Sequence, residues 1–303
     1  LFGSHKDEWH NSYSAEQFDT HGIDERFNRL IWRPPLPGLP AVEPSGQGAA
    51  AALLSPRDWR LVELQWAANS RENPAIIVLD DVLRPAVMER IQEHMLESTY
   101  WFEAKQHKSA GYLGAYLGDG FASHLLLQVG EALQEAMPSI VGHLPLYGAC
   151  ISLLCPHSLR FWPRHYSKPP WNTADMWAYK HRSSFEGVKV HADPSNVTMS
   201  FWTTPDIANL DPGSGGLGVY KARYPIGWSW EKHNSYVKNH EEVNDLIRKD
   251  GRPATIIPYR YNRLVIFPSD VFHYSDHFNF RSGYKNRRIN LTYLFGKSQT
   301  DTP

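Results

Sequence analysis

The hydrophobic pattern of the chain becomes regular at Pro74. The run Ile76 to Leu79 predicts a short buried strand, and Pro85 then opens a helix in which apolar residues recur three or four positions apart. A second helix with one apolar face is expected from Ala122 to Met137, where Pro138 ends it. Two helices therefore precede the rest of this region.

After Pro138 the pattern changes to short runs of alternating or continuous apolar residues, which are typical of strands. One helical insertion, from about Trp230 to Lys249, interrupts them. Because strands and helices do not alternate regularly, the chain is predicted to be mainly β with flanking helices, built as a double-sheet jelly roll or cupin-like barrel. The candidate strands are Tyr147 to Leu154, Leu159 to Tyr166, Val188 to His191, Asn196 to Thr203, Gly216 to Lys221, Ala254 to Tyr259, Arg263 to Phe267, Val271 to Ser275 and Arg288 to Phe295.

The first 73 residues differ from the rest of the chain in composition. They are polar at the start and rich in Pro and Gly later, with a low-complexity run from Pro44 to Ala52 that reads as a linker. A helix is expected from Ser55, as its N-cap, through Trp66. We therefore expect residues 1–73 to form a helical extension with a Pro/Gly-rich linker, and residues 74–303 to form the main domain.

Two of the predicted strands, Asn196 to Thr203 and Arg288 to Phe295, have one apolar face and one polar face. Such a strand usually has its polar side in water, but a barrel that holds a ligand would also have a polar interior. The neighbouring residues favour a ligand-binding interior, because one strand directly follows His191 and Asp193 and the other carries Arg288. The polar faces hold Asn196, Thr198, Ser200 and Trp202 in the first strand and Arg288, Asn290 and Thr292 in the last.

Composition excludes several function classes. The 31 basic residues nearly balance the 32 acidic ones, and no basic run is present, so we expect no nucleic-acid partner. No apolar run approaches the roughly 20 residues of a membrane span, so we expect no membrane partner either. Cys150 and Cys155 are too few for a disulfide framework, which favours a reducing, cytoplasmic location.

His191, Asp193 and His273 form a candidate metal centre. Residues two apart on a strand project to the same face, so His191 and Asp193 can share one coordination sphere, and His273 closes a distant apolar strand. A His-x-Asp match alone is weak evidence, because His5 and Asp7 form a second one. Two imidazoles and one carboxylate suit Fe(II) and leave positions open, whereas ordinary hydrogen-bonded histidines are the alternative.

Arg288 is a candidate for binding an acidic cosubstrate. A guanidinium can hold a carboxylate through two parallel hydrogen bonds, and Asn290, Thr292 and Ser200 lie on the polar faces that would complete such a pocket. Its neighbour Arg287 is expected to point to the opposite face and into solvent. Arg281, in the preceding turn, is a weaker candidate.

These blocks resemble the Fe(II)/2-oxoglutarate-dependent oxygenase superfamily, most closely its prolyl-hydroxylase-like branch. The resemblance rests on His191-Ala192-Asp193, on the strand from Asn262 to Phe267 leading to His273, and on Arg288-Ile289-Asn290-Leu291-Thr292. It implies a double-stranded β-helix, Fe(II) held by His191, Asp193 and His273, and 2-oxoglutarate on the metal with its far carboxylate on an arginine. O2 would be the second cosubstrate.

The chain departs from the family pattern in the long spacing between His273 and Arg288, and His277 is a rival third ligand. The carboxylate of Asp193 favours hydroxylation over halogenation, since halogenating members carry a small residue there. The expected activity is hydroxylation of an unactivated C–H bond in a small-molecule or peptide substrate, with release of succinate and CO2. The alternatives are a cupin-like non-redox metal-binding protein or isomerase, and an inactive scaffold.

Overall fold

The structure is a computed structural model that describes residues 48–101, 103–104, 111–116, 121, 123–144, 176–234 and 236–296. Its largest sheet has seven antiparallel strands in the order β1-β9-β6-β12-β4-β3-β2. The strands are β1 (Ile77–Leu79), β9 (Leu264–Pro268), β6 (Val197–Trp202), β12 (Ile289–Phe295), β4 (Met176–His181), β3 (Tyr112–Tyr116) and β2 (Glu103–Ala104).

Two smaller sheets complete the β structure. One has the order β10-β7-β8 and the other pairs β11 with β5, again antiparallel. The chain passes repeatedly between the large sheet and the small ones, as a double-sheet jelly roll requires. These strands are β5 (Ser184–Phe185), β7 (Leu217–Arg223), β8 (Thr255–Ile257), β10 (Val271–Ser275) and β11 (Phe278–Asn279).

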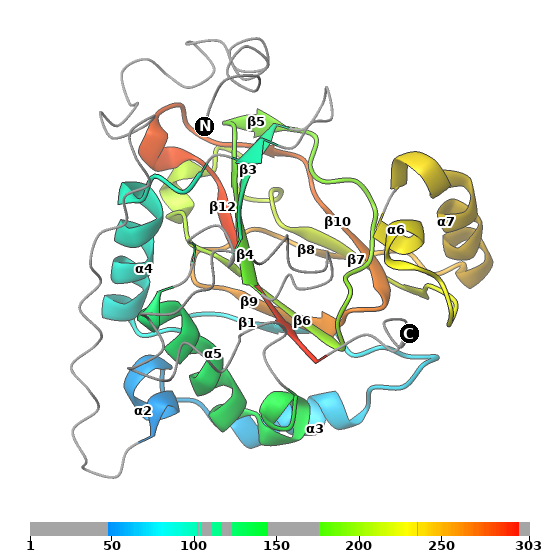
Figure 1. Cartoon of the computed structure of the whole chain (residues 1–303), viewed down its shortest axis with the longest axis horizontal. Coiled ribbons are helices and arrows are strands. Elements are labelled where there is room, and N and C mark those ends of the chain that lie inside the picture. Colours follow the sequence, from blue (N-terminus) through cyan, green and yellow to red (C-terminus); the bar gives the residue numbers. More distant parts are fainter. Residues whose placement is uncertain are drawn as a thin grey trace, which may run out of the picture.

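Helices flank the sheets on two sides (Figure 1). In this view α2 to α5 lie on the left and lower side, and α6 and α7 lie on the right. Short 3-10 or π turns occur at Pro138–Gly142, Asp206–Ala208 and Tyr284–Asn286. The α-helices are α2 (Ala49–Leu53), α3 (Trp59–Ala67), α4 (Pro85–Glu97), α5 (His124–Ala136), α6 (Trp230–Asn234) and α7 (Tyr236–Asp250).

The outer face of the seven-stranded sheet is covered by α2 to α5. The apolar residues of the two alternating strands, Met199 and Phe201 in β6 and Leu291 and Tyr293 in β12, are buried in one core cluster with helix residues such as Leu126. The hydrophobic effect thus places the apolar faces of β6 and β12 against the helices. The opposite, polar faces of β6 and β12 must then point inward, between the sheets.

A second apolar cluster fills part of the space between the sheets. Trp202, Val265 and Phe267 from the large sheet meet Val219 and Val271 from the small one. On the far side of the small sheet, α7 packs against β7. The mainly β prediction with flanking helices and two facing sheets is therefore confirmed.

Several helix predictions are confirmed with shifted ends. The helix that opens at Pro85 has this proline in its first turn, and α5 begins after Ser123, whose hydroxyl accepts from the backbone N–H of Leu126 at 3.2 Å. The predicted N-cap at Ser55 is wrong. Asp58 caps α3 instead, accepting from the N–H of Arg60 at 3.1 Å, because Ser55 pairs its own N–H with Val82.

The expected linker from Pro44 to Ala52 is wrong where the structure describes it, because Ala49–Leu53 is helical. Leu53 of α2 and Val62 of α3 are buried in the same core cluster as the large sheet. The division of the chain at residue 73 stays a prediction.

The remaining strand predictions are mixed. β10 has the predicted bounds, and β6, β7, β8, β9 and β12 lie within about two residues of theirs. Residues 188–190 are not a strand, and only His191 forms an isolated bridge there. The sequence missed β3 and β4. The predictions for residues 1–47, Tyr147 to Leu154 and Leu159 to Tyr166, and both cysteines, lie outside the described residues.

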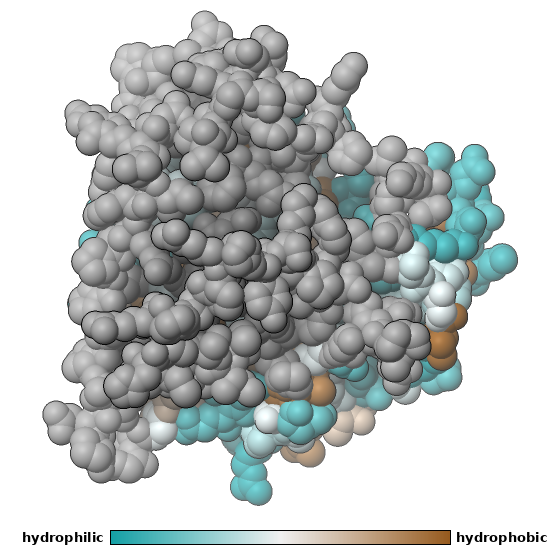
Figure 2. Space-filling view, in the orientation of Figure 1, coloured by the Kyte–Doolittle hydropathy of each residue, from teal (hydrophilic) through white to brown (hydrophobic). Residues whose placement is uncertain are grey.

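The surface in Figure 2 is mainly hydrophilic over the α6 and α7 side of the described structure. None of the helices within the described residues has both the length and the apolar character needed to cross a membrane.

Candidate metal centre

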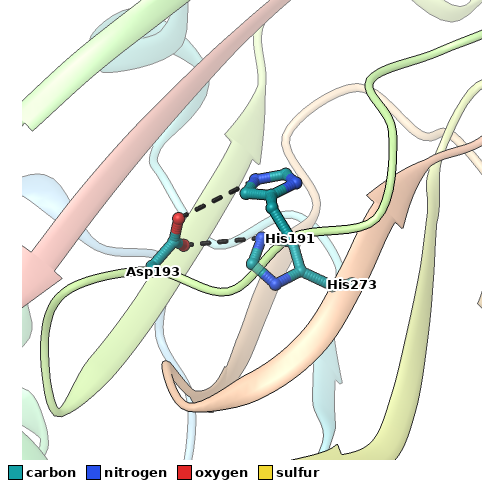
Figure 3. A group of neighbouring side chains, drawn as sticks. All are labelled: His191, Asp193 and His273. Carbon is teal, nitrogen blue, oxygen red and sulfur yellow. Dashed lines mark ion pairs between the residues drawn. The ribbon is translucent and has the colours of Figure 1, made fainter. Parts of the chain in front are cut away.

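The fold brings His191, Asp193 and His273 together, and Figure 3 shows their side chains close to one another. His191 and His273 form an antiparallel bridge, in which the N–H of each donates to the carbonyl of the other at 2.9 and 2.8 Å. The backbone of β10 thus fixes His191 directly, although the segment before it is not a strand. This bridge positions His191, which the sequence analysis expected a strand from Val188 to His191 to do.

The three side chains converge on a small volume. Asp193 Oδ1 lies 3.9 Å from His191 Nε2, and Asp193 Oδ2 lies 3.5 Å from His273 Nε2, as the dashed lines in Figure 3 show. One ligand atom from each residue lies within 4.8 Å of the others, and the imidazole centroids are 4.3 Å apart. Among the described residues, this is the one group of three or more metal-ligating side chains so arranged.

Both imidazoles are oriented by the main chain. The Nδ1 atom of His191 is 2.7 Å from the carbonyl of Lys189, and that of His273 is 3.2 Å from the carbonyl of Val271. A carbonyl only accepts, so each Nδ1 carries a proton and each ring turns its Nε2 toward Asp193. Metal-binding histidines are commonly held in this way.

Burial lowers the pKa of His273 to about 4, although Asp193 opposes the shift. The His273 imidazole is therefore neutral at pH 7, which is the form that binds a metal. His191 is partly exposed, with 18% of its side chain accessible, so the cluster is reached from one side. Two neutral imidazoles and a carboxylate form the donor set of an open Fe(II) site, and the residues present fit that ion.

Arg288 lies between the sheets with no exposed surface. Its Nε donates to the carbonyl of Gly215 at 2.7 Å, one Nη donates to Asn290 Oδ1 at 3.3 Å, and the guanidinium lies over the ring of Phe278 at 5.1 Å. Among the described residues no carboxylate lies within 4.0 Å of it. Burial lowers the pKa of Arg288 to about 10, so it stays charged at neutral pH.

The other predicted pocket residues share its face. Asn290 Nδ2 is 3.4 Å from Thr292 Oγ1, so Asn290 links Arg288 to Thr292 along β12. Ser200, 5% exposed, lies opposite Thr292 in the pairing of β6 with β12. The structure therefore collects Arg288, Asn290, Thr292 and Ser200 on one inner face, as predicted from strand parity.

The rival residues lie elsewhere. His277 is exposed and near Asp211 and Asp276, away from the three-residue cluster. Arg281 is exposed and donates to the carbonyl of Ile207. Arg287 was expected in solvent, and this is wrong. It is 4% exposed and donates to Ser183 Oγ at 3.1 Å, because the turn before β12 packs against the segment that follows β4.

Two strands that the sequence did not predict, β3 and β4, add an aromatic part to the inner face, although the concentration of Trp and Tyr between about 160 and 230, Trp177 and Tyr179 included, was visible in the sequence. Trp177 and Tyr179 of β4 are paired with residues of β12, the N–H of His181 donates to the carbonyl of Arg288, and Tyr112 and Tyr116 of β3 lie beside them. The hydroxyls of Tyr116 and Tyr179 are 3.2 Å apart, and burial raises the pKa of Tyr179 well above its usual range. Alternation in Met176 to His181 could have revealed β4, but its aromatic residues hide the period.

His181 and Trp202 carry buried polar atoms toward the same space. His181 Nε2 lies 3.2 Å from Asn290 Oδ1, while its Nδ1 has no hydrogen-bond partner. Burial and the nearby charge of Arg288 hold the pKa of His181 well below its usual range. The indole N–H of Trp202 is also buried without a partner. Unpaired polar atoms are uncommon in protein interiors, and a ligand or water bound here would supply the partners of these two.

The arrangement has two chemical parts. One is an open cluster of neutral nitrogen and carboxylate ligands for a divalent metal, and the other is a buried cation that needs an anion. Both lie on the side of the large sheet that faces the small sheets. The two parts together offer ligands for a metal and a cation for an acidic small molecule.

No model of a known protein family matches the chain, and a sequence comparison with curated proteins finds no relative. Solved structures do resemble it. A prolyl hydroxylase from Trichoplax adhaerens, in complex with a peptide fragment of the hypoxia inducible factor oxygen degradation domain, is 12% identical, with 78% of this chain and 90% of that chain covered and a TM-score of 0.41.

HygX from Streptomyces hygroscopicus, with nickel and 2-oxoglutarate bound, is 9% identical over 81% of this chain and 88% of its own, with a TM-score of 0.44. An oxidoreductase of the 2OG-Fe(II) oxygenase family from Burkholderia pseudomallei is 7% identical over 82% and 97%, with a TM-score of 0.41. Because these TM-scores are below 0.5, the function proposed below rests on this chain's own residues.

Proposed function

We propose that this chain is an Fe(II)- and 2-oxoglutarate-dependent dioxygenase. It would hydroxylate an unactivated C–H bond of a small-molecule or peptidyl substrate and release succinate and CO2. The observation that carries the proposal is that the His191, Asp193 and His273 cluster and the buried cation of Arg288 both lie on the side of the large sheet that faces the small sheets. A metal-only site would not need the cation, and an anion site would not need the ligands.

Each residue has a defined part in this proposal. His191, Asp193 and His273 hold Fe(II) through Nε2 and carboxylate oxygen atoms, and their Nδ1–H donors keep the two rings in place. Arg288, oriented by Asn290, binds the far carboxylate of 2-oxoglutarate. Fe(II) with 2-oxoglutarate and O2 supplies the oxidising chemistry when bound, and the protein contributes placement and exclusion of water.

The substrate wall is assigned to the aromatic residues of β3 and β4. Tyr116, Trp177 and Tyr179 have ring centroids 6.1 to 6.4 Å apart on the inner face. Rings with an apolar body and a polar edge suit a peptide or an amphipathic small molecule.

The deciding experiment is anaerobic addition of Fe(II) and 2-oxoglutarate to the metal-free protein. A weak visible charge-transfer band is expected with both, and not with Fe(II) alone or after His273→Ala. A protein that binds Fe(II) tightly but shows no 2-oxoglutarate-dependent band and releases no succinate would be the cupin-like alternative. Failure to bind any divalent metal would leave an inactive scaffold.

A further inference from the structure

Three buried hydroxyl groups lie in a row behind Asp193. Thr198 Oγ1 is 2.9 Å from Asp193 Oδ2 and 2.8 Å from Ser269 Oγ, which in turn is 2.5 Å from Ser195 Oγ. All four side chains are nearly inaccessible, with residue exposures of 3% for Asp193 and 0 to 4% for the others. They come from the ligand loop, from β6 and from the turn between β9 and β10, so three segments contribute to one row of hydrogen bonds that ends at a carboxylate oxygen.

The protons of this row have a preferred direction. Thr198 has one hydroxyl proton and two neighbouring oxygen acceptors, and the hydrogen bond to a charged carboxylate is the stronger of the two. Thr198 therefore donates to Asp193 and accepts from Ser269, which in turn accepts from Ser195. The competing acceptor of Ser195, the carbonyl of Val197, is at the outer limit of 3.5 Å. Aligned hydroxyls polarise one another, so the last bond is strengthened by the first two.

The same turn also holds the main chain of the ligand loop. The N–H of Asp193 donates to the carbonyl of Ser269 at 3.0 Å, and the N–H of Ser269 donates to the carbonyl of Asn196 at 3.1 Å. Ser269 thus contacts the ligand loop through both its backbone and its side chain. Because Oδ2 of Asp193 already accepts from Thr198, rotation of the carboxylate is restricted and Oδ1, 3.9 Å from His191 Nε2, keeps its lone pairs.

We infer that Thr198, Ser269 and Ser195 are positioning residues that fix the carboxylate of Asp193 in the orientation needed to bind a divalent metal. Thr198 makes the direct contact, Ser269 polarises it and anchors the loop, and Ser195 ends the row. The inference rests on the metal site of the proposed function. Packing alone does not account for the row, because methyl groups would fill the same space while leaving a buried carboxylate oxygen without its donor.

The test compares Thr198→Val, which keeps the shape and removes the hydroxyl, with Thr198→Ser, which keeps the hydroxyl. Mn(II) is titrated into the metal-free proteins and its affinity is measured by electron paramagnetic resonance of the free ion. Loss of such a supporting contact typically weakens metal affinity about 10- to 100-fold, and this is expected for Thr198→Val. Thr198→Ser should recover most of the affinity, and Ser269→Ala should lie between them.

Thr203→Val is the matched control. Thr203 is also buried, directly after β6, but its hydroxyl lies 3.5 Å from the carbonyl of Ile289 and does not touch the ligand loop. Its variant should bind Mn(II) like wild type, and circular dichroism in EDTA should show that all variants are folded.

The outcomes separate the two proposals. Wild-type protein that fails to bind Mn(II) overturns the metal site itself. Wild type that binds, with Thr198→Val unchanged in affinity, overturns the positioning role and leaves the metal site standing. Should Thr198→Val not fold, Ser269→Ala decides, since it leaves the Thr198 bond to Asp193 in place, and wild-type affinity in that variant would also overturn the inference.

Discussion

Arg288→Ala should strongly weaken binding of 2-oxoglutarate without weakening binding of iron. The guanidinium has no exposed surface, and its described partners are the carbonyl of Gly215, the amide oxygen of Asn290 and the face of Phe278. None of these is an anion, and Asp276 acts on the charge only from beyond ion-pair distance, so an anionic ligand would supply a direct partner. Truncating one member of a buried charge pair costs about 2 to 5 kcal/mol, or roughly 30-fold to several thousandfold in affinity.

The assay follows the Fe(II) and 2-oxoglutarate band anaerobically as 2-oxoglutarate is titrated. Arg288→Lys should recover only part of the affinity, because an ammonium cannot form two parallel bonds to one carboxylate. Arg281→Ala is the control, since Arg281 is exposed and outside the pocket. Fe(II) affinity measured without 2-oxoglutarate should stay near wild type in all three variants.

The reasoning would be refuted by an Arg288→Ala protein, folded by circular dichroism, whose apparent affinity for 2-oxoglutarate equals that of wild type. Strong weakening by Arg281→Ala instead would place the anion site in the turn before β12. A simultaneous loss of Fe(II) affinity in Arg288→Ala would show that the residue supports the whole cavity and not one carboxylate.

Three further outcomes are expected. In EDTA, the free energy of unfolding should fall as the pH drops below about 6.5, because His181 and His273 stay neutral in the folded chain while the unfolded chain binds their protons. Each contributes at most about 1.4 kcal/mol per pH unit, and urea unfolding at several pH values should give a flatter profile for His181→Gln. Asn262→Ala should lower the free energy of unfolding, measured in urea, by about 3 kcal/mol, because the Asn262 side chain bonds both backbone groups of Leu83 and its φ of 60° is unfavourable for alanine. Asn262→Gly should cost less, since glycine adopts this φ freely and only the two hydrogen bonds are lost. His233→Ala removes a 3.0 Å hydrogen bond to the carbonyl between the two ligand residues of the His-x-Asp segment, so Mn(II) titration should show weaker binding, partly restored in His233→Asn.

The sequence by itself determined which strands have one apolar and one polar face, and which candidate site residues lie on the polar face. In β12 and the residue before it, Ile289 and Leu291 alternate with Arg288 and Asn290, and a period of two can be satisfied only if one set faces the helices and the other faces inward. The same parity set the inner face of β6. Because this information is local, the candidate ligands and the arginine could be proposed without coordinates.

The sequence could not determine contacts made across long separations. A strand before His191 was expected, yet the residue is held by a backbone bridge to His273, a partner 82 positions away that no local period encodes. Arg287 was expected in solvent because charged residues usually are, and only packing against Ser183 buries it.

Tertiary structure alone decided how the metal cluster is supported. The sequence already favoured His273 over His277, because His273 closes an apolar strand, whereas the row from Ser195 through Ser269 to Thr198 joins residues from three segments and has no such signal. Each of these serines is unremarkable in sequence, since serine is common in turns. Their role becomes visible only in the folded chain, where water is excluded from the Asp193 carboxylate and Thr198 donates to one of its oxygens. A buried charged group must find its hydrogen-bond partners within the protein.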